Sequence, residues 1–210
     1  MKNIFLSTVA ILAMSSVAVA DEFTTTGEGF YIGAAYGNMN LDMSGSIDIS
    51  YYGDYNTDTQ VDLNTFMFQA GYKINPYVAF EARYWNAFGD MDYKVSVTGE
   101  GSQSVSIASN GEDAFGIYVK PMYPVTEELD IYALLGYVSV GEDFLDEGGL
   151  SWGLGATYSV TDNVSVFIDY TRLYAGTESD SIYFYEVGDY VDYDLDATLG
   201  SLNFGVSYKF

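Results

Sequence analysis

Apolar and polar residues alternate along most of the sequence beyond its N-terminal segment. Near the C-terminus apolar side chains occupy every second position, at Leu202, Phe204, Val206 and Tyr208, and small or polar residues stand between them. Residues 150–160 repeat this arrangement. Because successive side chains of a β-strand point to opposite faces, a period of two indicates strands with one apolar face and one small or polar face.

Eight segments show this alternation. They cover approximately residues 29–40, 61–74, 77–90, 113–125, 129–142, 149–161, 164–175 and 198–210. At about 12 residues each, they are longer than the usual globular strand of about 5 to 6 residues. They are long enough for tilted strands, which need about 9 to 11 residues to cross a bilayer.

The connections between these segments are alternately short and long. Tight turns are expected at residues 75–76, 126–128 and 161–163, whereas the longer and mostly polar connections are residues 41–60, 91–112, 143–148 and 176–197. Short turns on one rim and long loops on the other are typical of bacterial outer-membrane barrels. The sequence therefore predicts an all-β fold, an eight-stranded antiparallel transmembrane up-and-down β-barrel.

The N-terminal segment has the pattern of an export signal. Lys2 precedes a mostly apolar stretch, residues 4–19, which ends in a small-residue cleavage signature at Ala18 and Ala20. A membrane anchor is the alternative, but the stretch is short and contains several serines. We expect residues 1–20 to be a signal peptide cleaved after Ala20, and residues 21–210 to form the barrel domain.

The direction of the apolar face separates a membrane barrel from a soluble, lipocalin-like one. In a soluble barrel the large aromatic residues would have to fit inside a narrow lumen. In a membrane barrel they face lipid, and small and polar residues line the lumen. Tyrosines near the predicted strand ends match the two aromatic girdles of such barrels: Tyr36, Tyr72, Tyr84, Tyr123, Tyr137, Tyr158, Tyr170 and Tyr208.

Composition excludes several functions. The chain has 30 acidic residues against 7 basic ones, a net charge of −23, so it lacks the basic surface that nucleic-acid binding requires. It contains no histidine and no cysteine, which removes Ser-His, Asp-His and Cys-His catalysis, thiolate sites and disulfides. We expect no enzymatic activity, no cofactor and no nucleic-acid partner.

Several stretches resemble the transmembrane barrel of the OmpA family. The most specific are residues 71–81, and Lys120 with residues 123–126 and 129–132; residues 29–34 and 204–210 add weaker matches. The resemblance implies an eight-stranded outer-membrane barrel. It also assigns the C-terminal Phe210, with Tyr208, to the signal read by the outer-membrane assembly machinery. We expect the chain to lack the linker and periplasmic peptidoglycan-binding domain of the full-length family.

Charged residues fall on the lumen face of the predicted strands. They are Lys73, Glu81, Arg83, Lys120, Asp169 and Lys209. The resemblance assigns Glu81 and Lys120 to a lumen salt-bridge cluster that can act as a gate. The other partners of that cluster are not retained, because Thr157 and Phe167 stand at the matching positions. Arg83 and Asp169 are candidate substitutes for them. Two interpretations are open: the charges pair and fill the lumen, or they form a switchable ion path. The narrow lumen of an eight-stranded barrel favours the plug.

Most of the acidic residues lie in the long connections. Asp192, Asp194 and Asp196 could present oxygens to a divalent cation that bridges lipopolysaccharide phosphates, but no loop of known calcium-binding type is present, and a solvated acidic rim is favoured. The aromatic segment 182–193 could be extended strand or a contact surface. Arg172, on the apolar face, could contact a lipid headgroup phosphate or simply snorkel.

These observations predict a monomeric protein of the bacterial outer membrane. The expected partners are membrane lipid, lipopolysaccharide and the assembly machinery. The expected role is structural, or that of a narrow porin-like barrel. The alternative is a surface adhesin or receptor that acts through residues 41–60, 91–112 and 176–197.

Overall fold

The computed structural model describes residues 28–49, 53–97, 101–108, 113–141, 148–184 and 189–210, and this part of the chain is built from β-strands. The strands are β1 (Gly29–Ile49), β2 (Gly53–Asn75), β3 (Val78–Val97), β4 (Gly101–Ala108), β5 (Asp113–Pro124), β6 (Leu129–Val140), β7 (Gly148–Ser159), β8 (Val164–Phe184) and β9 (Asp189–Lys209). Among these residues, no helix is long and apolar enough to span a membrane.

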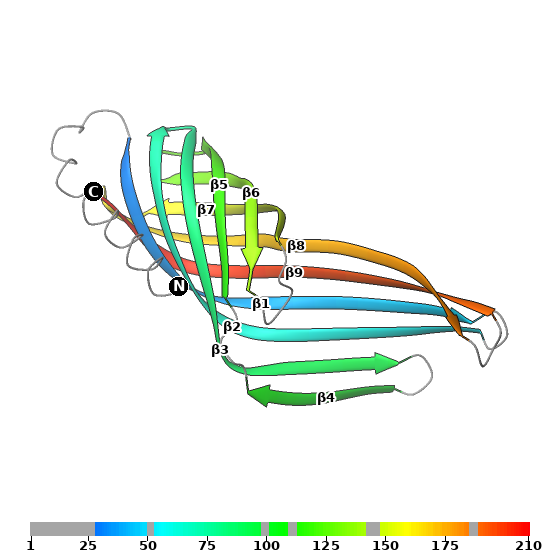
Figure 1. Ribbon diagram of the computed structural model, residues 1–210. Helices are drawn as coiled ribbons and strands as arrows, with labels where there is room; N and C mark the ends of the chain where they lie inside the picture. Colours follow the sequence, from blue (N-terminus) through cyan, green and yellow to red (C-terminus); the bar gives the residue numbers. More distant parts are fainter. Residues whose placement is uncertain (1–27, 50–52, 98–100, 109–112, 142–147, 185–188) are drawn as a thin grey trace, which may run out of the picture.

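Eight of the strands close into an antiparallel barrel (Figure 1). Each of these eight strands has two neighbours in the ring, in the order β2-β1-β9-β8-β7-β6-β5-β3, and the pairing of β2 with β3 closes it. β4 pairs with β3 alone, in a hairpin outside the ring. The predicted eight-stranded up-and-down barrel is confirmed.

The predicted strand ends on the long-loop side are wrong. Residues 41–60, 91–112 and 176–197 belong largely to strands: β1 and β2 remain paired as far as Ile49 and Gly53, and β8 and β9 as far as Phe184 and Asp189. β4 was not predicted at all. The alternation in fact continues into several of these segments: on β1 Leu41, Met43, Ile47 and Ile49 alternate with polar residues. The strands extend beyond the length that a bilayer requires because antiparallel pairing satisfies their backbone groups outside lipid as well. Apart from Gly148, the connection 143–148 lies outside the described residues.

The barrel wall is uneven in height. β5, β6 and β7 have 12 residues each, whereas β1, β2, β3, β8 and β9 have 20 to 23. Figure 1 shows the longer strands running well beyond β5–β7, and β3 bending before it pairs with β4. At this bend the register shifts opposite Leu63, and Gly89 has a φ of 85°, which glycine adopts without a steric penalty. We call the part beyond β5–β7 the extended sheet.

The outer face of the barrel is apolar, as predicted. Leu150, Leu154 and Phe204 are among many large apolar side chains that remain exposed, with 60–87% of their surface accessible. Of the predicted girdle tyrosines, six are exposed, and Tyr72 and Tyr84 are partly buried. A belt of this kind requires lipid around it, because soluble proteins rarely expose so large a continuous apolar surface.

The inner face differs from the prediction of small and polar residues alone. Trp85, Leu63, Met67, Leu134, Leu173 and Leu199 are fully buried inside the barrel. The alternation rule assigns one apolar face outward. It gives no answer where a strand is apolar on both faces, as β6 is over most of its length.

Candidate functional site in the barrel lumen

Four of the six charged residues predicted for the lumen meet in the half of the barrel nearest the short turns. Glu81 and Arg83 come from β3, Lys120 from β5 and Asp169 from β8. The spacing of two places Glu81 and Arg83 on the same face of β3. All four side chains are buried, with 0–5% of each residue accessible. We call these four residues the lumen cluster.

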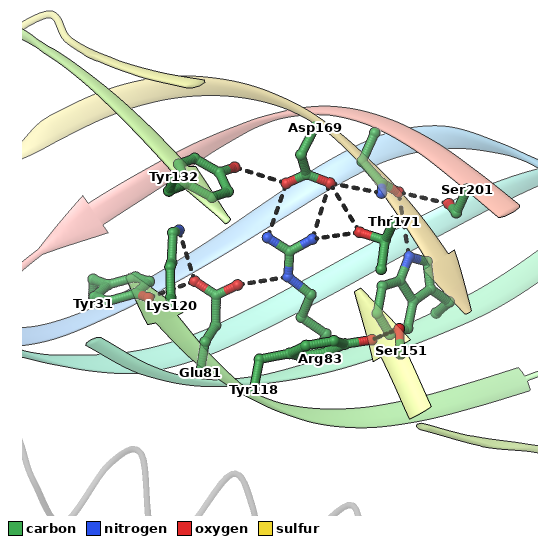
Figure 2. Close-up of polar contacts among 12 residues, drawn as sticks. Tyr31, Glu81, Arg83, Tyr118, Lys120, Tyr132, Ser151, Asp169, Thr171 and Ser201 are labelled. Carbon is green, nitrogen blue, oxygen red and sulfur yellow. Dashed lines mark hydrogen bonds and ion pairs between the residues drawn. The ribbon is translucent and has the colours of Figure 1, made fainter. Parts of the chain in front are cut away.

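Arg83 is the centre of the lumen cluster (Figure 2). Its Nε donates to Glu81 Oε1 at 2.5 Å, while Nη1 and Nη2 donate to the two carboxylate oxygens of Asp169 at 2.9 and 2.8 Å. Nη1 also donates to Thr171 Oγ1 at 3.3 Å. This fork-to-fork pairing is the strongest geometry available to an arginine and a carboxylate. It joins β3 to β8 across the lumen.

Lys120 is held by one carboxylate and two aromatic rings. Its Nζ donates to Glu81 Oε2 at 2.9 Å and lies 3.9 Å from the ring centroid of Tyr132 and 5.4 Å from that of Tyr31. Tyr31 donates its own hydroxyl hydrogen to Glu81, and Tyr132 donates to Asp169 Oδ2 at 2.8 Å. Aromatic faces stabilise a desolvated ammonium through cation–π attraction.

Further polar side chains complete the network around Asp169. Asn203 Nδ2 donates to Asp169 Oδ1 at 3.0 Å, and Asn203 Oδ1 accepts from Trp85 Nε1 at 3.3 Å and from Ser201 at 3.0 Å. With both carboxylates ionised, two negative and two positive charges cancel within the lumen cluster. Burying charges is tolerable only when they are paired and hydrogen-bonded in this way.

Small residues on facing strands make room for the lumen cluster. A Cβ atom added to Gly155 would lie 2.5 Å from Asp169 Cβ and 2.6 Å from the Tyr132 ring. One added to Gly71 would lie within 2.5 Å of Tyr31. The small residues predicted for the inner face therefore leave the space that the tyrosines and charged residues fill.

An apolar layer closes the lumen on the long-loop side of the lumen cluster. On every strand that contributes to both groups, the apolar residue lies on the long-loop side. Ala87 follows Arg83 on β3, Ala114 precedes Lys120 on β5, and Leu173 follows Asp169 on β8. The residues of this layer pack in one buried core and are each at most 4% accessible: Met39, Leu41, Val61, Leu63, Ala87, Ala114, Val138, Val140, Leu173 and Leu199. We call them the apolar layer.

The other predicted lumen residues take lesser positions. Lys73 pairs with Asp130 at 3.4 Å near the short-turn end, where both are partly exposed, and Lys209 is partly buried. Thr157 is partly buried, and Phe167 is buried beside Gly205. Sequence reasoning missed Tyr31, Tyr118, Tyr132 and Trp85. Tyr118 lies two residues before Lys120 on β5, so the parity of the strand could have placed it in the lumen.

The C-terminus completes the seam between β1 and β9. The amide of Phe210 donates to the carbonyl of Phe30 at 3.0 Å, and the Phe210 ring meets the ring of Tyr208 edge to face. Ala18 and Ala20, at the predicted cleavage site, lie outside the described residues. The assembly signal and the cleavage site stay predictions.

The three aspartates considered for a divalent-cation site belong to β9. Within the described residues, no group of three or more carboxylate side chains is arranged to hold a metal ion. Asp194 and Asp196 are exposed on β9, and the side chain of Asp192 is not among those described.

A closed antiparallel barrel with an apolar outer belt and a charged, filled lumen defines an outer-membrane β-barrel protein. Comparison with known proteins agrees: residues 7–210 match the family model described as "Outer membrane protein beta-barrel domain". The chain belongs to this family, and its bacterial outer-membrane location follows from that membership.

The similar proteins of known sequence are outer membrane protein A from several bacteria, which confirms the OmpA resemblance. The protein of Yersinia pseudotuberculosis is 29% identical over 209 residues, covering 96% of this chain and 53% of the relative. That of Escherichia coli O157:H7 is 28% identical over 150 residues, covering 67% and 37%. The chain thus spans about a third to a half of the length of these relatives.

The fold is also found in a solved structure. OprG from Pseudomonas aeruginosa superposes with a TM-score of 0.53 at 17% identity, covering 88% of this chain and 96% of that one. At this identity the similarity shows the fold alone.

Proposed function

We propose that this protein is a structural component of the outer membrane whose lumen is closed by its own side chains. The observation that carries the proposal is the stacking of two barriers inside the barrel. The lumen cluster is buried, balanced in charge and hydrogen-bonded throughout, and the apolar layer lies directly beyond it. The role requires no enzymatic activity and no cofactor.

The apolar layer argues against a simple electrostatic gate. An eight-stranded barrel is only wide enough for side chains to fill. A gate made of the lumen cluster alone would open when Arg83 or Lys120 changed partners, yet an ion would then meet the buried leucines and valines of the apolar layer. Narrow apolar constrictions exclude water and ions without any charge. Two different barriers in series favour a plug.

Truncating one carboxylate separates the plug from the gate. Glu81→Ala removes the shared partner of Arg83 and Lys120, and we expect the barrel to remain non-conducting because the apolar layer is intact. The measurement is single-channel recording of the refolded barrel in planar bilayers, with heat-dependent gel migration as the folding control. Steady conductance of a folded Glu81→Ala barrel would support the gate instead.

Three further features belong to the same proposal. Phe210 and Tyr208 would serve the outer-membrane assembly machinery, which agrees with the position of Phe210 at the β1–β9 seam. Lipid and lipopolysaccharide would surround the exposed apolar belt. The barrel closes within one chain, so a monomer suffices to span the membrane.

A second candidate function is binding at the cell surface through the extended sheet. In the described part of the chain, β4 pairs only with β3, and β8 beyond Arg172 pairs only with β9. Both strands therefore present unpaired backbone groups that an extended segment of a partner could use by strand addition. The binding surface would then be formed by paired strands in place of the predicted long polar loops.

Removing the hairpin tests this second function. Replacement of residues 91–108 by a short turn deletes β4 with its open edge, together with the part of β3 that pairs with residues 57–62 of β2. The pairing of residues 78–88 of β3 with β2, and of β3 with β5, stays in place. We expect the binding of whole cells to purified cell-surface or matrix proteins to fall at least tenfold when the hairpin is removed. Equal binding by both forms, at equal surface expression, would exclude the hairpin edge.

A further inference from the structure

Arg172 is a cation on the outer face of the barrel, at the edge of the apolar belt nearest the extended sheet. In register it lies between Trp152 on β7 and Gly200 on β9, and Gly200 in turn faces Asn40 on β1. One row nearer the short turns, the same strands carry Leu154, Tyr170 and Leu202, all exposed and facing lipid. Arg172 is therefore the first charged residue on the outer face of β8 beyond these belt residues, and on β7 the exposed belt continues beside it through Trp152 and Leu150.

A β-bulge shapes the surface next to Arg172. The register of β8 and β9 shifts between Arg172 and Tyr174, and the extra residue, Leu173, is fully buried. Bulges bend a strand and redirect its neighbouring side chains. Beside this one lies a hollow of about 300 Å³, whose lining includes Arg172, Thr177, Asp196 and Thr198 together with the small residues Ala175, Gly176 and Ala197.

The guanidinium of Arg172 has hydrogen-bonding capacity to spare. Its Nη2 reaches Thr198 Oγ1 only at 3.5 Å, and its Nε is buried with no hydrogen-bond partner. The nearest carboxylate on the hollow, Asp196, instead accepts from Thr177 Oγ1 at 2.5 Å. A buried N–H without a partner is costly, so an acceptor brought by a ligand would be strongly favoured.

The surroundings of Arg172 suit an amphipathic ligand. Trp152 and Tyr170 pack edge to face beside it, in the manner of aromatic residues at a membrane interface. Above it the hollow is polar, with the Thr198 hydroxyl on one wall. Below it Leu154 and Leu202 continue into the lipid-facing belt. A hydrogen-bond acceptor on a lipid headgroup beside Arg172 would have the acyl chains of that lipid next to Leu154 and Leu202.

We propose that Arg172 and the hollow beside it bind the phosphate of a phosphorylated outer-leaflet glycolipid, whose acyl chains lie along Leu154, Tyr170 and Leu202. The planar fork of an arginine matches the oxygens of a phosphate. The Nε that has no partner leaves one donor of this fork for such an acceptor. The site is separate from the lumen, so it holds whether or not the barrel conducts.

The test uses the whole protein extracted from outer membranes in detergent. Native mass spectrometry measures the binding of lipid A that carries its phosphates and of the same lipid A after enzymatic dephosphorylation. We expect the wild type to bind the phosphorylated form about tenfold more tightly, and Arg172→Gln to lose this preference. Arg172→Lys, which keeps the charge but not the fork, should retain only part of it.

Lys94→Gln is the matched control, because Lys94 is an exposed cation on β3 in the extended sheet. It should bind both lipids as the wild type does. An equal loss in Lys94→Gln and Arg172→Gln would show that net charge alone is responsible and would overturn the proposal. So would equal binding of the two lipids by the wild type. Displacement of the lipid by an equal concentration of inorganic phosphate would likewise assign the site to free phosphate.

Discussion

Replacement of Arg83 by methionine is expected to lower the free energy of unfolding by about 3–5 kcal/mol, which is the usual cost of removing one partner from a buried ion pair. Methionine fills much of the same volume but leaves Asp169 without its bidentate partner and leaves Lys120 as the remaining cation of the lumen cluster. Urea unfolding of the barrel in lipid bilayers, followed by tryptophan fluorescence, measures the change.

Two controls establish that charge balance causes the loss. Arg83→Met combined with Asp169→Asn removes one charge of each sign, and we expect it to recover part of the stability in a double-mutant cycle. Lys94→Gln removes an exposed cation and should change the free energy of unfolding by less than about 0.5 kcal/mol. If Arg83→Met unfolds at the urea concentration of the wild type, the lumen cluster does not hold the barrel together.

Opening the lumen should require changes in both barriers at once. Leu199→Ser alone places a polar group in the apolar layer but leaves the lumen cluster intact. Glu81→Ala alone disrupts the lumen cluster but leaves the apolar layer intact. We expect each single variant to stay silent and the Glu81→Ala, Leu199→Ser double variant to show frequent openings in planar bilayers. The physical reason is that water enters a narrow lumen only when its apolar constriction has become polar.

Leu202 provides the matched control for this experiment. It lies on the same strand as Leu199 but faces lipid, with 53% of its surface exposed. Glu81→Ala combined with Leu202→Ser should therefore remain silent, although it makes the same chemical change three residues away. Equal conductance in the two double variants would mean that the serine loosens the barrel in general, and the apolar layer would lose its assigned role.

The barrel itself could be predicted from the sequence because lipid imposes a simple rule. Where a strand crosses hydrocarbon, its outer face must be apolar, and the alternation of β7 and the end of β9 shows this directly. The rule does not say where a strand ends outside the hydrocarbon. The extended parts of β1 and β9 still alternate, but their length exceeds what a bilayer requires. In β4 the alternation is limited to Val105 and Ile107 between serines, which is too short to predict a strand by itself.

The lumen could be predicted only in part. Strand parity places Glu81, Arg83, Lys120 and Asp169 inside, and the cost of an unpaired buried charge requires that they meet. Parity says nothing about which residue faces which across the lumen. The pairing of Arg83 with Asp169 joins positions 86 apart in the sequence, and the aromatic rings around Lys120 come from β1 and β6.

The apolar layer had the weakest signal. Its leucines, valines and single methionine look like lipid-facing residues of the opposite parity. On β1 the apolar side of the alternation changes from even positions, up to Tyr36, to odd positions, from Met39 onward. Leu41 and Val61 fall in or beside segments that the sequence assigns to loops. Only the strand pairing shows that Leu41 faces both Val61 and Leu199 inside the barrel.

The central claim is that the lumen is closed by its own side chains, and single-channel recording of the unmodified, refolded barrel in planar bilayers tests it most directly. Incorporation is verified by heat-dependent gel migration of protein recovered from the same vesicles. The closed lumen predicts no steady current above that of the lipid alone over the usual range of voltage. A reproducible, stepwise current from the wild-type barrel would contradict it.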